Sequence, residues 1–277
     1  MITTVAPLEV LLRLLDDDSP EVRAGLEQAL AEYEGDASDA LAGAGITLSA
    51  EEAGRLSALL LPGRMKRLRE EWIVPANGLD EADGDWESFE SLLRQVSDFL
   101  HDGVSLRPSL PDQLDLLAAE LRSPPAKPYA FARALFGAEY FTRQEGKEGG
   151  IGDADLASVI EKRRGTSHAL VLIYLLVARR FGVPAYACLL PSECLAMIEE
   201  NEVWWVMLCG EEVQREKVSQ VLAQEHQMPE EAHQALSRPA TLRELLQRLL
   251  QRLSRQLAKD DRLEEAALIR ELHTALN

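Results

Sequence analysis

The stretch EKRRGTSHALVLIYLLVARRFGVPAYACLLPSECLAMIE, residues 161–199, decides the fold of this 277-residue chain. Thr166 or Ser167 is suited to begin a helix that continues through ALVLIYLLVARRF, because a hydroxyl can accept a hydrogen bond from a free amide of the first turn. Apolar residues occupy all sides of this helix, which predicts burial on most of its surface. Gly182 then provides a C-terminal cap, and Pro184 prevents the helix from continuing.

Three short runs after this helix have the composition of β-strands. They are AYACLL at residues 185–190, CLAMIE at 194–199 and VWWVMLC at 203–209. Asn201 lies between the last two runs, where it predicts a hairpin turn. A buried helix that leads into a small antiparallel sheet predicts an α+β core.

Outside this core the sequence predicts helices, so we expect an α+β protein that is mostly α. Residues 1–80 are expected to form a helical N-terminal region, in which periodic leucines and the turn DDDSPEVR predict one HEAT-like hairpin at residues 8–33. The core is expected to cover residues 86–236, and its last helices are predicted at about 213–225 and 229–236. A C-terminal helical hairpin is predicted at residues 240–277.

The composition disfavours several classes of partner. The formal net charge is −18, from 29 Lys and Arg against 47 Asp and Glu. Such a chain lacks the basic face that binds nucleic-acid phosphates, and an anionic membrane surface repels it. No apolar run approaches the roughly 20 residues of a membrane span, and the first residues lack the basic flank of a signal peptide. Three cysteines without a CxxC pair predict a reducing cytoplasm.

Residues 161–199 resemble the transglutaminase-like superfamily and, within it, the SirB-type branch of bacterial proteins. The residues that carry the resemblance form a spaced set: Arg163-Arg164-Gly165, the helix through Ala178, Phe181-Gly182-Val183-Pro184 and Leu190-Pro191. The resemblance implies a papain-like core. In such a core a cysteine at the N-terminus of the central helix is the nucleophile, a histidine on the next strand activates it, and an aspartate one strand further orients the imidazole.

At the matched positions this sequence has other residues. The nucleophile position is Ser167, the histidine position is Glu193, and the aspartate position falls near Met207 or Leu208. A serine hydroxyl needs a strong, well-placed base, and a solvated carboxylate is too weak for that work. The resemblance therefore implies a core without its catalytic residues.

Ordinary structural roles account for the same positions. Ser167 is predicted to cap the helix. Glu193 is predicted to lie in solvent or to pair with Arg163 or Arg164. His168 lies about 100° further around the helix than Ser167, so we expect a surface or capping histidine in the first turn.

The cysteines Cys188, Cys194 and Cys209 are predicted to be buried, unreactive strand residues. No histidine occupies a defined neighbouring position that would activate Cys194, and the sequence lacks the set of four nitrogen and sulfur ligands that zinc requires. We therefore predict no metal site and no cofactor.

Four residues are candidates for binding contacts: Arg163, Arg164, Trp204 and Trp205. The two guanidinium groups just before the central helix are expected to pair with carboxylates. The tryptophans are adjacent on a strand, so their rings should lie on opposite faces of the sheet. An exposed ring would be an interaction anchor; the alternative is that both rings pack beneath flanking helices.

The leading functional hypothesis is a pseudoenzyme, a non-catalytic scaffold or regulatory protein whose protein partner carries basic patches. Two alternatives stay open. One is a hydrolase or transferase that uses an unrecognised site at the N-terminus of the central helix, and the other is a module that binds a small molecule in the old cleft. A Ser167–Glu193 distance within about 3.2 Å would favour the enzyme. The sequence gives no basis for predicting the oligomeric state.

Overall fold

A computed structural model describes residues 8–17, 19–122, 124–137, 141–144, 150–191, 193–210, 213–224 and 230–276 of the chain. The chain divides into two compact units. Unit 1 comprises Met1–Ile73 and Asp98–Pro108, and unit 2 comprises Val74–Ser97 and Ser109–Asn277. None of the helices in the described ranges is long and apolar enough to cross a membrane.

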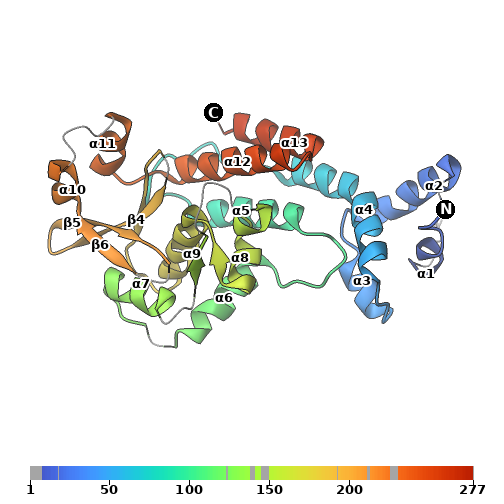
Figure 1. Ribbon diagram of the computed structural model, residues 1–277, viewed down its shortest axis with the longest axis horizontal. Coiled ribbons are helices and arrows are strands. Elements are labelled where there is room, and N and C mark those ends of the chain that lie inside the picture. The colour runs from blue at the N-terminus through green and yellow to red at the C-terminus, as the bar shows by residue number, and fades with distance from the viewer. Residues whose placement is uncertain are drawn as a thin grey trace. The chain divides into compact units, whose positions relative to one another are not determined.

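Unit 1 is helical, as expected for the N-terminal region. Its helices are α1 (Leu8–Leu12), α2 (Pro20–Leu30), the 3-10 helix η1 (Ala31–Tyr33), α3 (Ser38–Gly43) and α4 (Ala50–Glu71) (Figure 1). Hydroxyl caps fix two of the starts, because Ser19 Oγ accepts from the Val22 amide and Ser49 forms a capping box with Glu52. The HEAT-like character of residues 8–33 stays a prediction.

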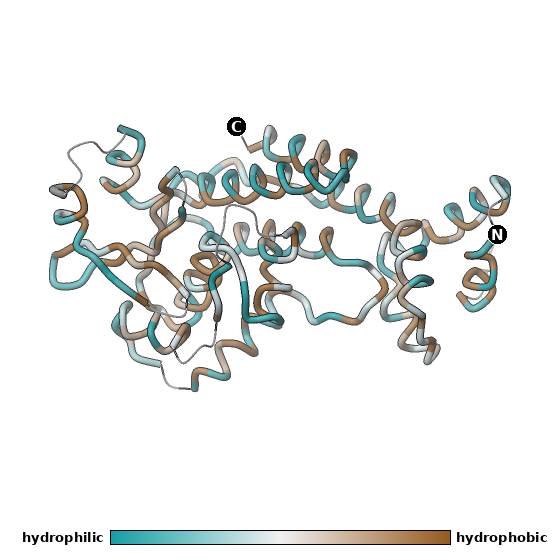
Figure 2. The backbone as a smooth tube through the Cα atoms, in the orientation of Figure 1, coloured by the Kyte–Doolittle hydropathy of each residue, from teal (hydrophilic) through white to brown (hydrophobic). Residues whose placement is uncertain are grey.

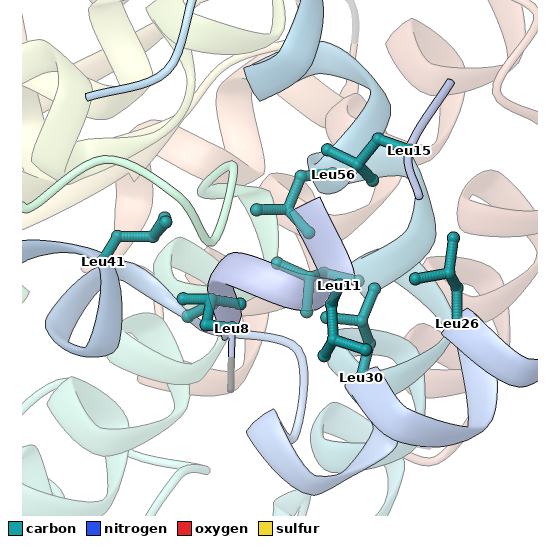
Figure 3. Packing of buried hydrophobic residues seen from close by; sticks show 9 residues of the cluster. Leu8, Leu11, Leu15, Leu26, Leu30, Leu41 and Leu56 are labelled. Atoms are coloured by element: carbon teal, nitrogen blue, oxygen red, sulfur yellow. The ribbon is translucent and has the colours of Figure 1, made fainter. Parts of the chain in front are cut away.

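Leucine side chains form the core of unit 1. Leu11 of α1 and Leu30 of α2 lie next to one another in Figure 3, and Leu56 reaches them from α4. The complete buried cluster is Leu8, Leu11, Leu15, Leu26, Leu30, Ala37, Leu41, Leu56 and Leu60. Leu15 follows α1 and Ala37 precedes α3, and the other members lie on four helices. Each helix is too short or too polar to be stable alone, so mutual burial holds them together.

Unit 2 contains the central helix and the sheet. Its helices are α5 (Trp86–Leu100, whose end from Asp98 belongs to unit 1), α6 (Leu110–Glu120), α7 (Pro128–Phe136), α8 (Leu156–Lys162), α9 (Ser167–Arg180), α10 (Val218–Gln224), α11 (Glu230–Ser237), α12 (Leu242–Lys259) and α13 (Leu263–Thr274). The 3-10 helix η2 (Ile151–Asp153) precedes α8.

The predicted central helix is α9, and it is buried along its whole apolar length from His168 to Ala178. Gly182 follows it with a φ of 65°, the left-handed conformation that glycine adopts without strain. The Val183 amide then donates to the Ala178 carbonyl at 2.9 Å and closes the C-terminus. Within the buried stretch the Tyr174 hydroxyl donates to the Pro128 carbonyl at 3.0 Å, which fixes α9 against the start of α7.

The main sheet is antiparallel, with the strand order β3-β4-β5-β6. Its strands are β3 (Tyr186–Leu189), β4 (Cys194–Glu200), β5 (Val203–Leu208) and β6 (Gln214–Lys217). Helices α10 and α11 cover the face that carries Cys188, Met197 and Val206, and α9 packs against β4 (Figure 1). The two-stranded parallel sheet pairs β1 (Thr142–Arg143) with β2 (Arg164–Gly165).

The prediction of one helix over residues 213–225 was wrong, because its first part is strand β6 and only Val218–Gln224 is helical. Residues Gln214 to Lys217 pair with β5, which provides the free edge of an existing sheet. Such an edge strand needs no apolar alternation, so the polar run QREK gave no strand pattern.

The predicted C-terminal hairpin consists of α12 and α13, which pack side by side (Figure 1). Thr241 and Glu244 form a capping box at the start of α12. Hydrophobic and hydrophilic residues alternate along α12 in Figure 2, and its leucines are buried. The amphipathic pattern thus turns one face of α12 toward the interior of unit 2.

Candidate functional site

The N-terminus of α9 is the position that the sequence assigns to a nucleophile. Thr166 is the cap, since its Oγ1 accepts from the Ala169 amide at 3.3 Å. The prediction of Ser167 as the cap was therefore wrong. The Ser167 hydroxyl instead accepts from the Cys194 amide at 3.5 Å, a long hydrogen bond that joins α9 to the start of β4.

Glu193, at the predicted histidine position, is engaged elsewhere. Its Oε1 accepts from Arg143 Nη1 at 2.8 Å, and the two side chains are 42% and 30% exposed. The predicted pairing with Arg163 or Arg164 was wrong, because β1 brings Arg143 beside the β2–α9 connection and Arg143 takes this role. In the described part of the chain no hydrogen bond joins Glu193 to the Ser167 hydroxyl.

His168 was predicted to lie at the surface, and this was wrong. The residue is 1% exposed, and neither ring nitrogen has a hydrogen-bond partner among the described residues. Burial, followed by the charges of Arg252 and Arg248, lowers the pKa of His168 to about 3. The imidazole is therefore neutral at physiological pH and faces two arginines of α12.

The two α12 arginines have different surroundings. Arg248 Nη1 donates to the carbonyl oxygens of Leu190 and Pro191, both at 3.2 Å. Arg252, one turn further along α12, makes no hydrogen bond or ion pair with any described residue. Burial and the positive charge of Arg248 lower the pKa of Arg252. Within the described ranges, neither arginine of this pair forms an ion pair with a carboxylate.

All three thiols are buried, as predicted from their strand positions. Burial raises the pKa of Cys188 to about 12, and it also raises the pKa of Cys194 and Cys209. At the predicted aspartate position Met207 is fully buried and Leu208 follows it, so no carboxylate arises there. A search of the described residues for groups of histidine, cysteine and carboxylate side chains that could hold a metal finds none.

Comparison with known proteins places this core in a family. A model of the transglutaminase-like superfamily matches residues 105–251, just over half of the chain. The chain belongs to the transglutaminase-like superfamily. Neither a search of curated proteins nor a search of solved structures finds a match. The matched residues include α9, the four strands β3 to β6 and the first half of α12, so Arg248 lies within the transglutaminase-like core.

The arginines before α9 hold the loops of the transglutaminase-like core. Arg163 Nη2 donates to the Glu120 carboxylate, at 2.9 Å for the shorter contact, and its guanidinium lies 5.1 Å from the centre of the Phe141 ring. Arg164 is half-exposed and lies 3.9 Å from Asp153. The predicted pairing of both arginines with carboxylates is confirmed; a role in binding a partner stays a prediction.

Both tryptophans of β5 are partly buried. Trp204 packs beside Tyr186 with the ring centres 5.7 Å apart, on the face covered by α10 and α11. Trp205 lies beneath the Arg215 guanidinium at 4.3 Å and the Lys217 amine at 5.4 Å. Neighbouring side chains therefore cover both rings in part, and their role as interaction anchors stays a prediction.

Among the described residues, no imidazole or thiol forms a hydrogen bond with the Ser167 hydroxyl at the N-terminus of α9. Papain-like chemistry needs a thiolate at the helix N-terminus and an imidazole within hydrogen-bond distance. In this core the group at the helix N-terminus is the Ser167 hydroxyl, which accepts a hydrogen bond from the Cys194 amide. The sequence interpretation missed Arg143, Arg248 and Arg252, although the spacing of four between Arg248 and Arg252 places them on one side of α12.

Proposed function

We propose that this chain is a pseudoenzyme of the SirB-type branch, a scaffold or regulatory protein that binds a protein partner and has no catalytic role. The observation that carries the proposal is the environment of Ser167. Its hydroxyl accepts from a backbone amide, while the carboxylate at the family histidine position, Glu193, is ion-paired with Arg143. A hydroxyl without a base attacks no amide or ester at a useful rate.

The chemistry of the partner follows from charge. With a net charge of −18, the surface favours partners that carry basic patches and disfavours nucleic acids and anionic membranes. The protein is proposed to act in the cytoplasm, where buried thiols such as Cys188 stay reduced. Selection on such a protein would act on its surface and leave the old nucleophile position free to change.

The catalytic part of the proposal is tested with purified protein and a panel of amide, ester and transamidation substrates. We expect no turnover above the uncatalysed rate, and the same result for the Ser167→Ala variant. Circular dichroism of both proteins verifies that they are folded. Turnover that is present in the wild type and lost in folded Ser167→Ala would reject the pseudoenzyme and favour a hydrolase or transferase.

The binding part is tested by affinity capture from native cytoplasm at about 50 and 500 mM salt, because salt screens an attraction between opposite charges. We expect one enriched protein of basic surface charge, with recovery that falls at high salt. Recovery of nucleic acid at physiological salt, or of a partner whose binding does not change with salt, would contradict the charge argument.

A further inference from the structure

The N-terminus of α9 and the facing part of α12 gather positive and hydrogen-bond-donating groups that have nothing to bind. The amides of Ser167 and His168 have no described acceptor. The first amides of a helix lack partners within it, and the capping hydroxyl of Thr166 accepts from the Ala169 amide instead. The His168 ring is buried with both nitrogens unpartnered. Arg252 is likewise without a described partner.

Hydrogen bonds to the β3–β4 connection and to the start of β4 fix the side chains of Ser167 and Arg248. The Ser167 hydroxyl is fixed to the Cys194 amide, and the Arg248 guanidinium is fixed to the carbonyls of Leu190 and Pro191. The β3–β4 connection therefore touches both α9 and α12 and brings their charged groups together. Arg252 follows Arg248 by one helical turn, so it extends the same positive surface.

An unpaired buried imidazole and two adjacent guanidinium groups carry a free-energy cost. A buried polar group without a partner loses its hydrogen bonds to water, and like charges on one helix face repel each other. In a chain of net charge −18, carboxylates for pairing are abundant, yet neither Arg248 nor Arg252 forms an ion pair with a carboxylate of the described residues, and Glu193 is paired with Arg143. One small acceptor of negative charge could accept from the free amides, from the guanidinium groups and from the one N–H of the neutral imidazole.

We propose that Ser167, His168, Arg248 and Arg252 form a binding site for a small oxyanion, a phosphate or a carboxylate. Guanidinium groups match the paired oxygens of both anions, and the N-terminus of a helix adds free amides and a favourable dipole. Ser167, Arg248 and Arg252 are partly exposed to solvent, while buried His168 supplies an N–H donor. The site does not depend on the proposed scaffold function.

The test uses the whole protein and inorganic phosphate, with chloride adjusted to keep ionic strength constant. The chain has five histidines, so their ring signals can be resolved by NMR, and a His168→Gln variant assigns the signal of His168. We expect phosphate to shift this signal in a saturable way and to raise the pKa of His168. Acetate in place of phosphate distinguishes a carboxylate ligand from a phosphate ligand.

Arg252→Gln is the decisive variant, because this side chain makes no hydrogen bond or ion pair with a described residue and glutamine keeps much of its length. We expect the dissociation constant of the anion to rise roughly tenfold or more. The matched control is Arg255→Gln, which removes the same charge from an exposed position of α12 and should change the constant less than about twofold.

Three results would overturn the proposal: no saturable shift with phosphate or acetate in the wild type, equal weakening by the two variants, or binding unchanged in Arg252→Gln. Melting curves of the variants show that they are folded. If Arg252→Gln fails to fold, the His168 signal of the wild type decides alone.

Discussion

Lowering the pH from 7 to 5 is expected to destabilise unit 2 through His168. Burial, Arg252 and Arg248 lower the pKa of this imidazole in the folded protein to about 3, against an ordinary value near 6.5 in the unfolded chain. Between these values the unfolded chain binds a proton that the folded protein does not bind. The contribution of His168 to the free energy of unfolding is therefore fully present above pH 6.5. It falls with decreasing pH and levels off below about pH 3.

The magnitude follows from this difference in pKa. Each pH unit below 6.5 costs about 1.4 kcal/mol of unfolding free energy, so pH 5 removes about 2 kcal/mol. For a unit of this size the melting temperature should drop by about 4–8 °C from this residue alone. The full loss at pH 3 would be about 5 kcal/mol, which is comparable to the total stability of many domains.

The assay is urea unfolding at pH 7 and pH 5, in buffers without phosphate or carboxylates. His168→Gln removes the titrating group, so its stability should fall between the two pH values by about 2 kcal/mol less than that of the wild type. His233→Gln is the control, because His233 is exposed on α11. Equal losses in the wild type and in His168→Gln would refute the reasoning, since His168 would then not be buried and neutral.

Three further outcomes are expected. Tyr174→Phe removes the hydroxyl that donates to the Pro128 carbonyl and should lower the free energy of unfolding by about 1–2 kcal/mol in urea; an unchanged midpoint would show that the carbonyl finds another donor. Gly165→Ala should lower it by about 1–3 kcal/mol, because a Cβ there would lie 2.6 Å from Val159 Cγ1, and a variant as stable as the wild type would mean that α8 moves freely. The cysteine thiols should react with a maleimide slowly in native protein and rapidly in denaturant, and fast native labelling would place them at the surface.

The sequence predicted those helices and turns whose conformation is determined by the residues within the element itself. Helix α9 is apolar on all sides and ends at Gly182, whose positive φ only a glycine adopts easily. The turn at Asn201 has positive φ at both central residues, 54° at Asn201 and 62° at Glu202, which is the geometry of a tight hairpin. Strand β6 and helices α3 and α8 were missed, since they are short and depend on packing partners distant in sequence.

The candidate site could be predicted only in part, and the reason is again distance along the chain. The position of Ser167 at a helix N-terminus follows from residues 161–199, but the residues that surround it do not. Arg248 and Arg252 come from α12, and His168, which its angle to Ser167 led us to expect at the surface, is buried near them. The helical angle between two residues tells only that their side chains point in different directions. Which of the two side chains is buried depends on the elements that pack against the helix, and these come from elsewhere in the sequence.

On the proposed function, the charges around the N-terminus of α9 explain why a single substitution would not create a papain-like site. In a papain-like site an imidazole beside a thiolate is stabilised as a cation, because the two groups form an ion pair. Here the thiols are buried, Glu193 is bound to Arg143, and His168 is kept neutral by burial and by the charges of Arg252 and Arg248. Placing a cysteine at position 167 alone would therefore give a thiol without a base among the described residues. We expect Ser167→Cys to remain inactive on amide and ester substrates, and turnover in that single variant would mean that a base within reach exists after all.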